Sequence, residues 1–230
     1  RDWARAGRIA QQLEQSNQGS FSTRLAHYLC EQAATCVSAH DPEQAQKLLR
    51  EAIAIAPGAP RAGLELATLL LASHQAAPAY SILSQTLDAA PAAAPVLAAS
   101  LARAALASGA ATQAMDRLKA CYEQSPSLDV LDAIVALEAA NTSTAPSGRD
   151  WYVRHLEREP SLIAAAKWIE GEKLEHEQFH PLVQKALDHA VKPLSRYRCA
   201  ACGFEAKQHF WQCPGCQTWD SYPAKRVEEL

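Results

Sequence analysis

Four prolines recur along the chain at almost equal intervals, and this spacing limits the possible folds more than any other feature. Pro57, Pro91, Pro126 and Pro160 are separated by 34, 35 and 34 residues. Proline lacks a backbone donor and clashes with the preceding helical turn, so each one marks the end of a helix. A fixed period of this length indicates a repeat in which each helical hairpin buries its apolar face on the next.

Residues at fixed distances before these prolines have the same size in successive repeats. A small residue stands twelve positions before each proline: Ala45, Ala79, Ala114 and Gly148. A large residue stands eight positions before it: Leu49, Leu83, Leu118 and Tyr152. A second small column lies twenty-four positions before it: Ala33, Ala67, Ala102 and Ala136. Small residues let the helices of one repeat touch, whereas large ones fill the space to the next repeat. The 47 alanines among 230 residues fit this pattern, because alanine loses no side-chain entropy in a helix.

The period resembles that of the tetratricopeptide repeat. We therefore expect residues 1–192 to form an all-α, right-handed superhelical solenoid, beginning with the second helix of a truncated repeat. The predicted helices span 2–16, 24–39, 42–55, 60–73, 75–89, 95–108, 111–124, 127–140, 147–158, 161–171 and 178–191. A plain alanine-rich bundle is the alternative, but a bundle does not require a fixed period. Pro193 and Ser195 are expected to mark a linker to a second domain at 193–230.

The second domain is predicted from the cysteines. Four of the seven cysteines lie within eighteen residues: Cys199, Cys202, Cys213 and Cys216. They form two C-x2-C pairs, and each pair can form a knuckle whose backbone amides point at the sulfurs. Gly203 relieves the turn of the first knuckle. Two knuckles provide a tetrahedral four-sulfur site for one metal ion, zinc or iron, in a rubredoxin-like or zinc-ribbon β-hairpin domain.

Other functions of these cysteines are disfavoured. A disulfide scaffold would spread paired cysteines through a short chain, and a thiol redox pair would need a βαβ context. Because all four positions are protein sulfurs, the metal is expected to be structural rather than hydrolytic. Six aromatic residues around the pairs are expected to form a small core: Tyr197, Phe204, Phe210, Trp211, Trp219 and Tyr222.

A zinc-protease motif, H-E-x-x-H, occurs at residues 176–180. A peptidase would use His176 and His180 as metal ligands and Glu177 as the general base. Pro181 follows the second histidine directly and pushes His180 out of helical geometry. No third ligand follows at the expected spacing, so we interpret the segment as a solvated helix end.

The inner face of the repeats is the expected binding surface. In the repeat register the first helices present His27, Arg61, Thr68 and Arg103 inward, among mainly apolar residues, which suits a partner helix or the chain's own terminal domain. The formal net charge of −3 argues against nucleic acid as the partner, and residues 193–230 carry only +1, from five basic and four acidic residues. No apolar run reaches the roughly 18–20 residues that span a bilayer, so these 230 residues are expected to be soluble.

The combination of repeats and knuckles, with the string Tyr197-Arg198-Cys199 through Trp219 and the run Leu25-Ala26-His27-Tyr28, resembles the lipopolysaccharide assembly protein B family (LapB, also called YciM). The resemblance implies a non-catalytic adaptor at the cytoplasmic face of the bacterial inner membrane. Such an adaptor helps the FtsH protease degrade the LpxC deacetylase, and it is controlled by an inner-membrane regulator of lipopolysaccharide synthesis. It also implies a membrane-anchoring N-terminal helix and first repeats that this sequence lacks, so we expect the sequence to be a fragment. Of the site residues, only the four cysteines carry over. A peptide-binding scaffold of another pathway stays open as the alternative.

Overall fold

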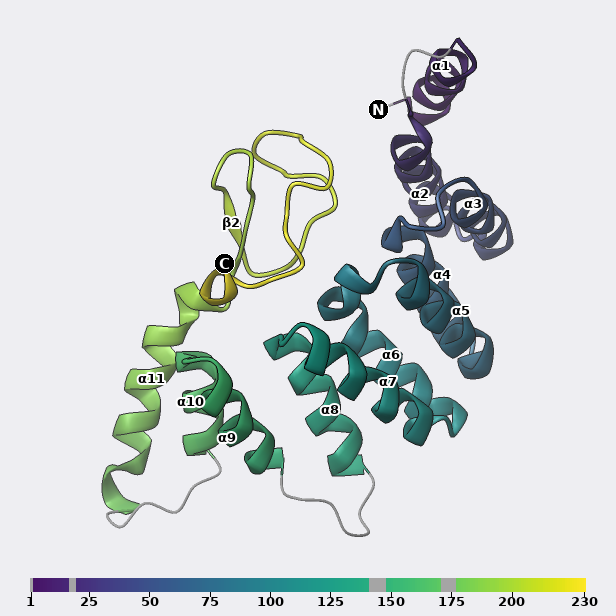
Figure 1. Cartoon of the computed structure of the whole chain (residues 1–230). Coiled ribbons are helices and arrows are strands. Elements are labelled where there is room, and N and C mark those ends of the chain that lie inside the picture. The colour runs from purple at the N-terminus through teal and green to yellow at the C-terminus, as the bar shows by residue number, and fades with distance from the viewer. Residues whose placement is uncertain (1, 17–19, 141–147, 171–176) are drawn as a thin grey trace. The chain divides into compact units, whose positions relative to one another are not determined.

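The computed structural model describes residues 2–16, 20–140, 148–170 and 177–230, with side chains from Asp150 and Gln178 onward after the last two gaps. It divides into two compact units, Arg1–Ala114 and Met115–Leu230, and the division of the chain falls within helix α7 (Ala111–Gln124). Each unit is described by itself. Figure 1 follows the chain through both.

Unit 1 consists of paired helices joined by short turns. Before α7 it contains α1 (Trp3–Gln15), α2 (Ser22–Ser38), α3 (Pro42–Ile55), α4 (Pro60–Ala72), α5 (Ala76–Ala89), the short 3-10 helix η1 (Pro91–Ala93) and α6 (Ala94–Ser108). Helix α2 packs on α3 and α4 packs on α5, while the first helices of successive pairs, α2, α4 and α6, contact one another in turn. This is the stacking of tetratricopeptide repeats, and it confirms the predicted fold class.

The helix starts follow from their first residues. At α3, Asp41 accepts a hydrogen bond from the amide of Gln44 at 3.0 Å, and Pro42 occupies the first turn. This is the capping arrangement expected of an acidic residue before a proline. Pro60 likewise occupies the first turn of α4, although its preceding residue, Ala59, provides no side-chain cap.

A left-handed residue ends the first helix of three successive repeats. His40 and His74 have φ of 60° and 59°, and Gly109 has φ of 76°. They are 34 and 35 positions apart, so they form another column of the repeat. After each of them the next amide donates to a carbonyl five residues earlier, at 2.8–2.9 Å. This is the Schellman arrangement, and it makes the tight turn into the second helix.

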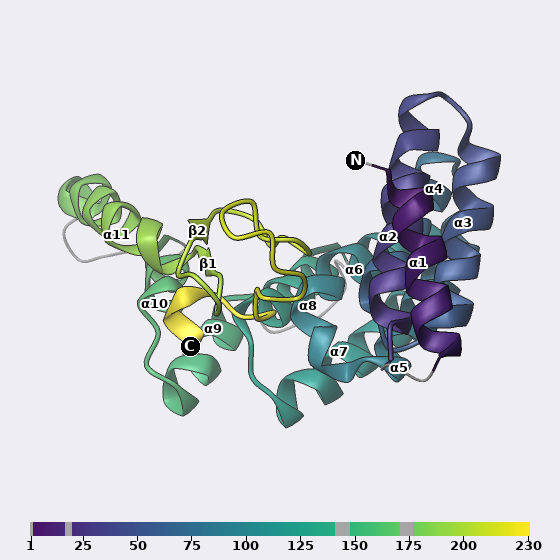
Figure 2. The same cartoon turned by 90° about the horizontal axis from the view of Figure 1, so that it is seen from above.

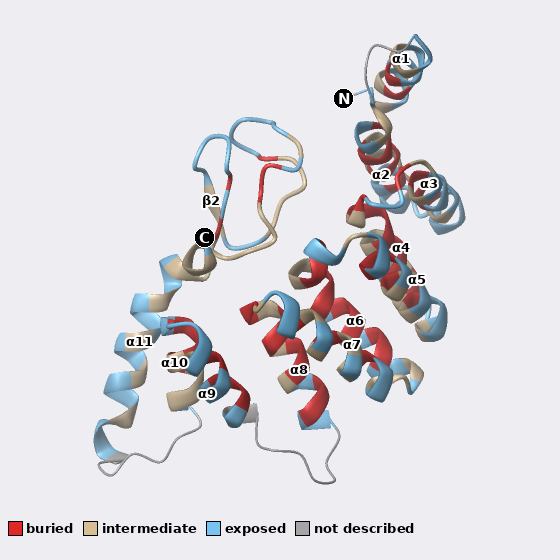
Figure 3. Cartoon of the chain, in the orientation of Figure 1, coloured by how far each residue is buried: buried red, intermediate tan, exposed pale blue. Residues whose placement is uncertain are grey.

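The small and large columns form the core, shown in red in Figure 3. Ala45, Ala79, Ala114, Leu83 and Leu118 have no measurable exposure. The fourth repeat departs from the register, because Ala136 is exposed while Ile134 and Leu137 are fully buried.

One helical stretch among the described residues, Pro91–Ser108, is long and apolar enough to cross a membrane by length and composition alone. Our expectation that no such run exists was wrong, because Ser100 and Arg103 interrupt the apolar sequence without removing its overall character. Half of this stretch is buried inside the protein. Since α6 packs on α4 and α5, it has the position of a core helix of the repeats.

Unit 2 contains the remaining helices and a small ribbon. After α7 come α8 (Leu128–Ala140), α9 (Gly148–Arg158), α10 (Leu162–Glu170), the 3-10 helix η2 (Glu177–Phe179) and α11 (His180–Leu194). The ribbon follows with β1 (Tyr197–Arg198), β2 (Glu205–Ala206) and the 3-10 helix η3 (Val227–Glu229). Figure 2 shows β1 beside β2, and the two strands pair antiparallel with Tyr197 opposite Ala206.

The predicted linker is shorter than expected. Pro193 lies inside α11, which continues to Leu194, and only Ser195 and Arg196 separate the helix from β1. The helix ends one residue after this proline, which fits the tendency of proline to end helices. The proposed boundary between residues 192 and 193 stays a prediction.

Candidate metal centre

Each cysteine pair lies in a tight turn closed by backbone hydrogen bonds. Strands β1 and β2 flank the first knuckle, where the amide of Cys199 donates to Phe204 at 3.0 Å. At the second knuckle the amide of Cys213 donates to Thr218 at 2.9 Å, inside a bridge between Gln212 and Trp219. Each knuckle is therefore the turn of a small hairpin.

A left-handed residue follows the second cysteine of each pair. Gly203 after Cys202 has φ of 77°, and Gln217 after Cys216 has φ of 62°. The first position therefore uses glycine as predicted. The second tolerates glutamine, whose side-chain amide donates to the carbonyl of Pro214 at 3.0 Å and so ties down the turn.

The four sulfurs have the spacing of metal ligands. Cys199 Sγ and Cys216 Sγ are 3.8 Å apart, Cys202 Sγ and Cys213 Sγ are 3.7 Å apart, and all four sulfurs lie within 4.8 Å of one another. In a tetrahedron with metal–sulfur distances of about 2.3 Å, neighbouring sulfurs lie about 3.8 Å apart. Disulfide sulfurs would be about 2.05 Å apart. The residues therefore fit one tetrahedral zinc or iron ion.

The surroundings shift the pKa values of the cysteine thiols in different directions. Loss of water raises the pKa of Cys199, but hydrogen bonding with the Ser221 hydroxyl and with backbone amides brings this pKa down to about 6. The amide of Phe204 lowers the pKa of Cys202, but burial and the neighbouring thiols outweigh this effect and raise it to about 12. Metal ligation requires the thiolate form, so the lowered pKa of Cys199 favours ligation there, whereas Cys202 must release its proton when a metal binds.

The metal centre is surrounded by a small core. Tyr197, Tyr222, Cys199 and Cys213 are buried together, with Phe210 packed against them. Of the six predicted aromatic residues, Phe204 differs most, because it is 44% exposed and lies over the second knuckle, where its ring is 3.4 Å from a Cβ built on Gly215.

His209 completes this core, although the sequence offered no sign of it. Its ring makes edge contacts with the rings of Tyr197, Trp211 and Tyr222, with centroids 4.7–6.1 Å apart. Its Nε2 lies 3.1 Å from the carbonyl oxygen of Tyr222. Burial lowers the pKa of His209 below its ordinary value.

An ion pair fastens the ribbon to the helices of unit 2. Arg226 contacts both carboxylate oxygens of Asp129 in α8, at 2.5 and 3.2 Å, and also donates to the carbonyl of Ser195 at 2.7 Å. The hydroxyl of Tyr197 donates to Asp129 at 3.0 Å. Burial and the Asp129 carboxylate raise the pKa of Tyr197, so its hydroxyl keeps its proton for this bond. The first residue of β1 and the end of the ribbon thus converge on one carboxylate.

Two further carboxylates bind the starts of two helices. Glu229 accepts a hydrogen bond from the amide of Leu128, the first residue of α8, at 2.8 Å. Glu228 accepts from the amide of Leu162, the first residue of α10, at 2.6 Å and from the Ser161 hydroxyl at 2.7 Å. Helix N-termini carry unsatisfied amides and partial positive charge, so carboxylates stabilise them. The η3 segment therefore caps both helices.

The four residues predicted for partner binding have different surroundings in unit 1. His27 and Arg61 are buried, with exposures of 2% and 7%, whereas Thr68 and Arg103 are exposed. Arg61 donates to Glu65 at 2.6 Å and to Glu31 at 2.9 Å. Arg103 donates to the Ser100 hydroxyl at 3.2 Å. Their role in binding a partner stays a prediction.

The zinc-protease motif lies partly outside the described residues, which include neither His176 nor the side chain of Glu177. His180 is the first residue of α11, and its Nε2 lies 2.9 Å from the carbonyl oxygen of Ile169. Pro181 therefore begins a helix here rather than ending one, as proline often does in the first turn.

Two parts of the chain match known protein families. Residues 37–104 match the tetratricopeptide repeat, and residues 197–222, which contain the four cysteines, match the rubredoxin metal binding domain. Over 96% of its length the chain is 23% identical to lipopolysaccharide assembly protein B of Haemophilus influenzae and 22% identical to the protein of the same name from Escherichia coli K12. It spans 57% and 58% of the length of these relatives.

Proposed function

Because the chain belongs to the lipopolysaccharide assembly protein B family, a family of non-enzymatic repeat scaffolds with a rubredoxin-like metal domain, we propose that it is an adaptor in the control of lipopolysaccharide synthesis. In this proposal it brings the LpxC deacetylase to the FtsH protease and so promotes the degradation of LpxC. It acts at the cytoplasmic face of the inner membrane under an inner-membrane regulator, and a segment outside residues 1–230 provides the membrane contact.

The attachment of the metal ribbon to the repeat helices carries this proposal. The ribbon contacts α8 through Arg226 and Glu229, and it contacts α10 through Glu228. A bound metal would hold Cys199, Cys202, Cys213 and Cys216 together and thereby fix the ribbon from which these contacts extend. Four protein sulfurs leave no position for a water molecule, so the metal serves structure rather than hydrolysis.

The small size of the ribbon explains why it needs both the metal and the helices. A segment of about 35 residues cannot bury enough apolar surface to fold alone, and metal binding then supplies folding free energy. The ribbon in turn satisfies the amides at the starts of α8 and α10. The metal is thereby coupled to the order of a repeat surface on which a partner protein can dock.

The proposal is tested by the lifetime of LpxC in bacteria whose own gene for this protein is deleted and which carry a plasmid that encodes the full-length protein. The wild-type copy is expected to shorten the half-life of LpxC and to copurify with FtsH and LpxC. The C199S/C202S double variant should lose metal and lengthen the half-life. C36S is the matched control, because Cys36 lies in α2 of unit 1 and is not one of the four clustered cysteines.

An unchanged LpxC half-life in the presence and absence of the wild-type copy would refute the role in LpxC degradation. A protein that binds neither FtsH nor LpxC would support the alternative, a repeat scaffold of another pathway. Full activity in the metal-free double variant would refute the structural role of the metal.

A further inference from the structure

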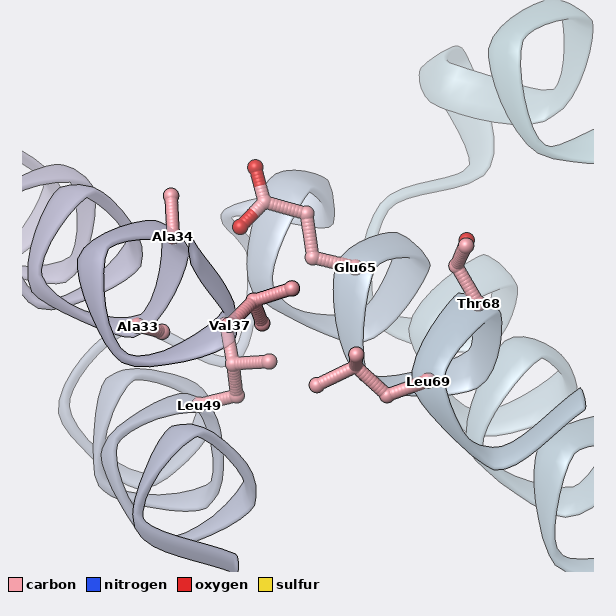
Figure 4. Close-up of a pocket in the computed structure, with 7 residues that line it drawn as sticks. All are labelled: Ala33, Ala34, Val37, Leu49, Glu65, Thr68 and Leu69. Carbon is pink, nitrogen blue, oxygen red and sulfur yellow. The ribbon is translucent and has the colours of Figure 1, made fainter. Parts of the chain in front are cut away.

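A hollow of about 250 Å³ opens in unit 1 between the first helices of two successive repeats (Figure 4). Its lining comes from α2, α4 and one residue of α3: Ala33, Ala34, Val37, Leu49, Glu65, Thr68 and Leu69. One water molecule occupies about 30 Å³ of liquid, so the hollow has room for a whole side chain. We call it the α2–α4 pocket.

The floor of the α2–α4 pocket is apolar. Val37, Leu49 and Leu69 point toward one another in Figure 4, and Val37 is 43% exposed although its neighbour Leu49 is fully buried. A large exposed apolar residue in a concave site indicates a surface that an apolar ligand group can cover. The pocket therefore suits an aliphatic side chain.

The rim of the pocket is polar and negative. The carboxylate of Glu65 and the hydroxyl of Thr68 lie at the edge above this floor in Figure 4. Thr68 is exposed and donates its proton to the carbonyl of Leu64 at 2.8 Å, so its oxygen faces a ligand as an acceptor. Glu65 is the single charged residue in the lining.

Arg61 does not reverse the sign of this charge. Its Nε contacts Glu65 and its Nη2 contacts Glu31, so one guanidinium serves two carboxylates. When all three are ionised, these side chains together carry a formal charge of −1. Arg61 is itself only 9% exposed at its side chain, whereas the two glutamates are about 30% exposed. The sequence suggested that Arg61 adds a positive charge to this face. In the structure, the two glutamates are the more exposed members of the ion cluster.

We propose that the α2–α4 pocket binds an aliphatic side chain of a partner protein whose segment also carries a lysine or arginine one helical turn away, and that this cation pairs with Glu65. The apolar floor selects the aliphatic group, and the charge of the rim selects the cation. The inference rests on the adaptor function proposed above only in requiring a protein partner, and it does not depend on the pathway.

The test uses three soluble alanine- and glutamine-based helical peptides and the 230-residue chain. The first carries one leucine and a lysine four positions later, the second replaces this lysine with glutamine, and the third replaces the leucine with alanine. Binding is followed by the amide NMR signals of Ala34, Val37, Thr68 and Leu69. The lysine peptide is expected to shift these signals at millimolar concentration. It should bind about two- to fivefold more tightly than the glutamine peptide, which is the range of a partly exposed ion pair.

Two protein variants assign this preference to Glu65. E65Q should abolish the difference between the lysine and glutamine peptides, and E51Q is the matched control, because Glu51 is exposed on α3. Since Glu65 also pairs with Arg61, T68K provides a second variant that keeps all three charged residues of this cluster. It places a cation one turn from Glu65 and should remove the preference for lysine.

Equal binding of the lysine and glutamine peptides would overturn the proposal, and so would a lysine preference that persists in both E65Q and T68K. Binding of the alanine peptide as tight as that of the leucine peptide would show that the floor selects nothing. The assay contains neither FtsH nor LpxC. Its failure is therefore distinguishable from failure of the proposed function, which is read from LpxC half-life.

Discussion

Replacing Glu228 with alanine is expected to loosen the start of α10 and to destabilise unit 2. The carboxylate accepts hydrogen bonds from the amide of Leu162 at 2.6 Å, from the amide of Ile163 at 3.3 Å and from the hydroxyl of Ser161 at 2.7 Å. Alanine removes all of these acceptors at once. It also removes the negative charge from the positive end of the helix.

The magnitude follows from the two effects that this carboxylate combines. Loss of a capping side chain costs about 0.5–2 kcal/mol. Loss of a favourable charge at a helix N-terminus costs about 0.3–1 kcal/mol more. We therefore expect the free energy of unfolding to fall by about 1–3 kcal/mol in E228A. For a chain of this size, a loss of about 2 kcal/mol lowers the melting temperature by roughly 4–8 °C. E228Q keeps one acceptor oxygen but loses the charge, so its loss should be smaller.

Two measurements check this reasoning. Urea denaturation gives the change in free energy, and hydrogen exchange reports the amides of Leu162 and Ile163, which should exchange about 5–30 times faster in E228A. The control is E157A, because Glu157 is exposed on α9, where a surface substitution changes stability by less than about 0.5 kcal/mol. The capping role is refuted if E228A and E157A have the same stability and exchange rates.

Three further outcomes are expected. In C199S the protein should bind less than one metal ion per chain by elemental analysis while C36S keeps full occupancy, and equal occupancy would contradict the four-sulfur site. G63A should lower the free energy of unfolding, measured in urea, by about 1–3 kcal/mol, because an added Cβ would lie 2.0 Å from the Thr86 hydroxyl oxygen. Adding T86A to this variant should recover part of the loss. Unchanged stability of G63A would disprove the close contact. Burial lowers the pKa of His155, so this residue takes up a proton in the unfolded protein at a higher pH than in the folded protein. Stability should therefore fall as the pH drops below about 6.5. The urea midpoint should depend less steeply on pH in H155F, and an unchanged slope would exclude this effect.

Most of the helical architecture could be predicted from the sequence because the repeat imposes it many times. The prolines and the small and large columns give the ends and the packing of each helix, and the observed helices differ from the predicted ones by at most three residues. The left-handed column was missed. Histidine at His40 and His74 gives no local sign of a turn, and only its alignment with Gly109 could have revealed the column.

The metal ligands could also be predicted, because chelation requires particular residues at particular spacing. The attachment of the ribbon to the helices could not be predicted from the sequence. Glu228 and Glu229 look like ordinary surface acids in the sequence, and their function arises only when folding brings them to helix starts 66 and 101 positions away. The burial of Arg61 was missed for a similar reason, since its partner Glu31 lies 30 positions away in another helix.

The contact between Glu229 and Leu128 has a consequence for folding kinetics. The helical hairpins of unit 1 join neighbours in sequence, so each can form over a short loop. The cap of α8 instead closes a loop of 101 positions. Closing a long loop lowers the entropy of the chain before the contact that it allows can stabilise the fold. Proteins with such distant contacts therefore fold more slowly. The first turn of α8 should therefore become protected late in refolding, only after the ribbon has formed and docked.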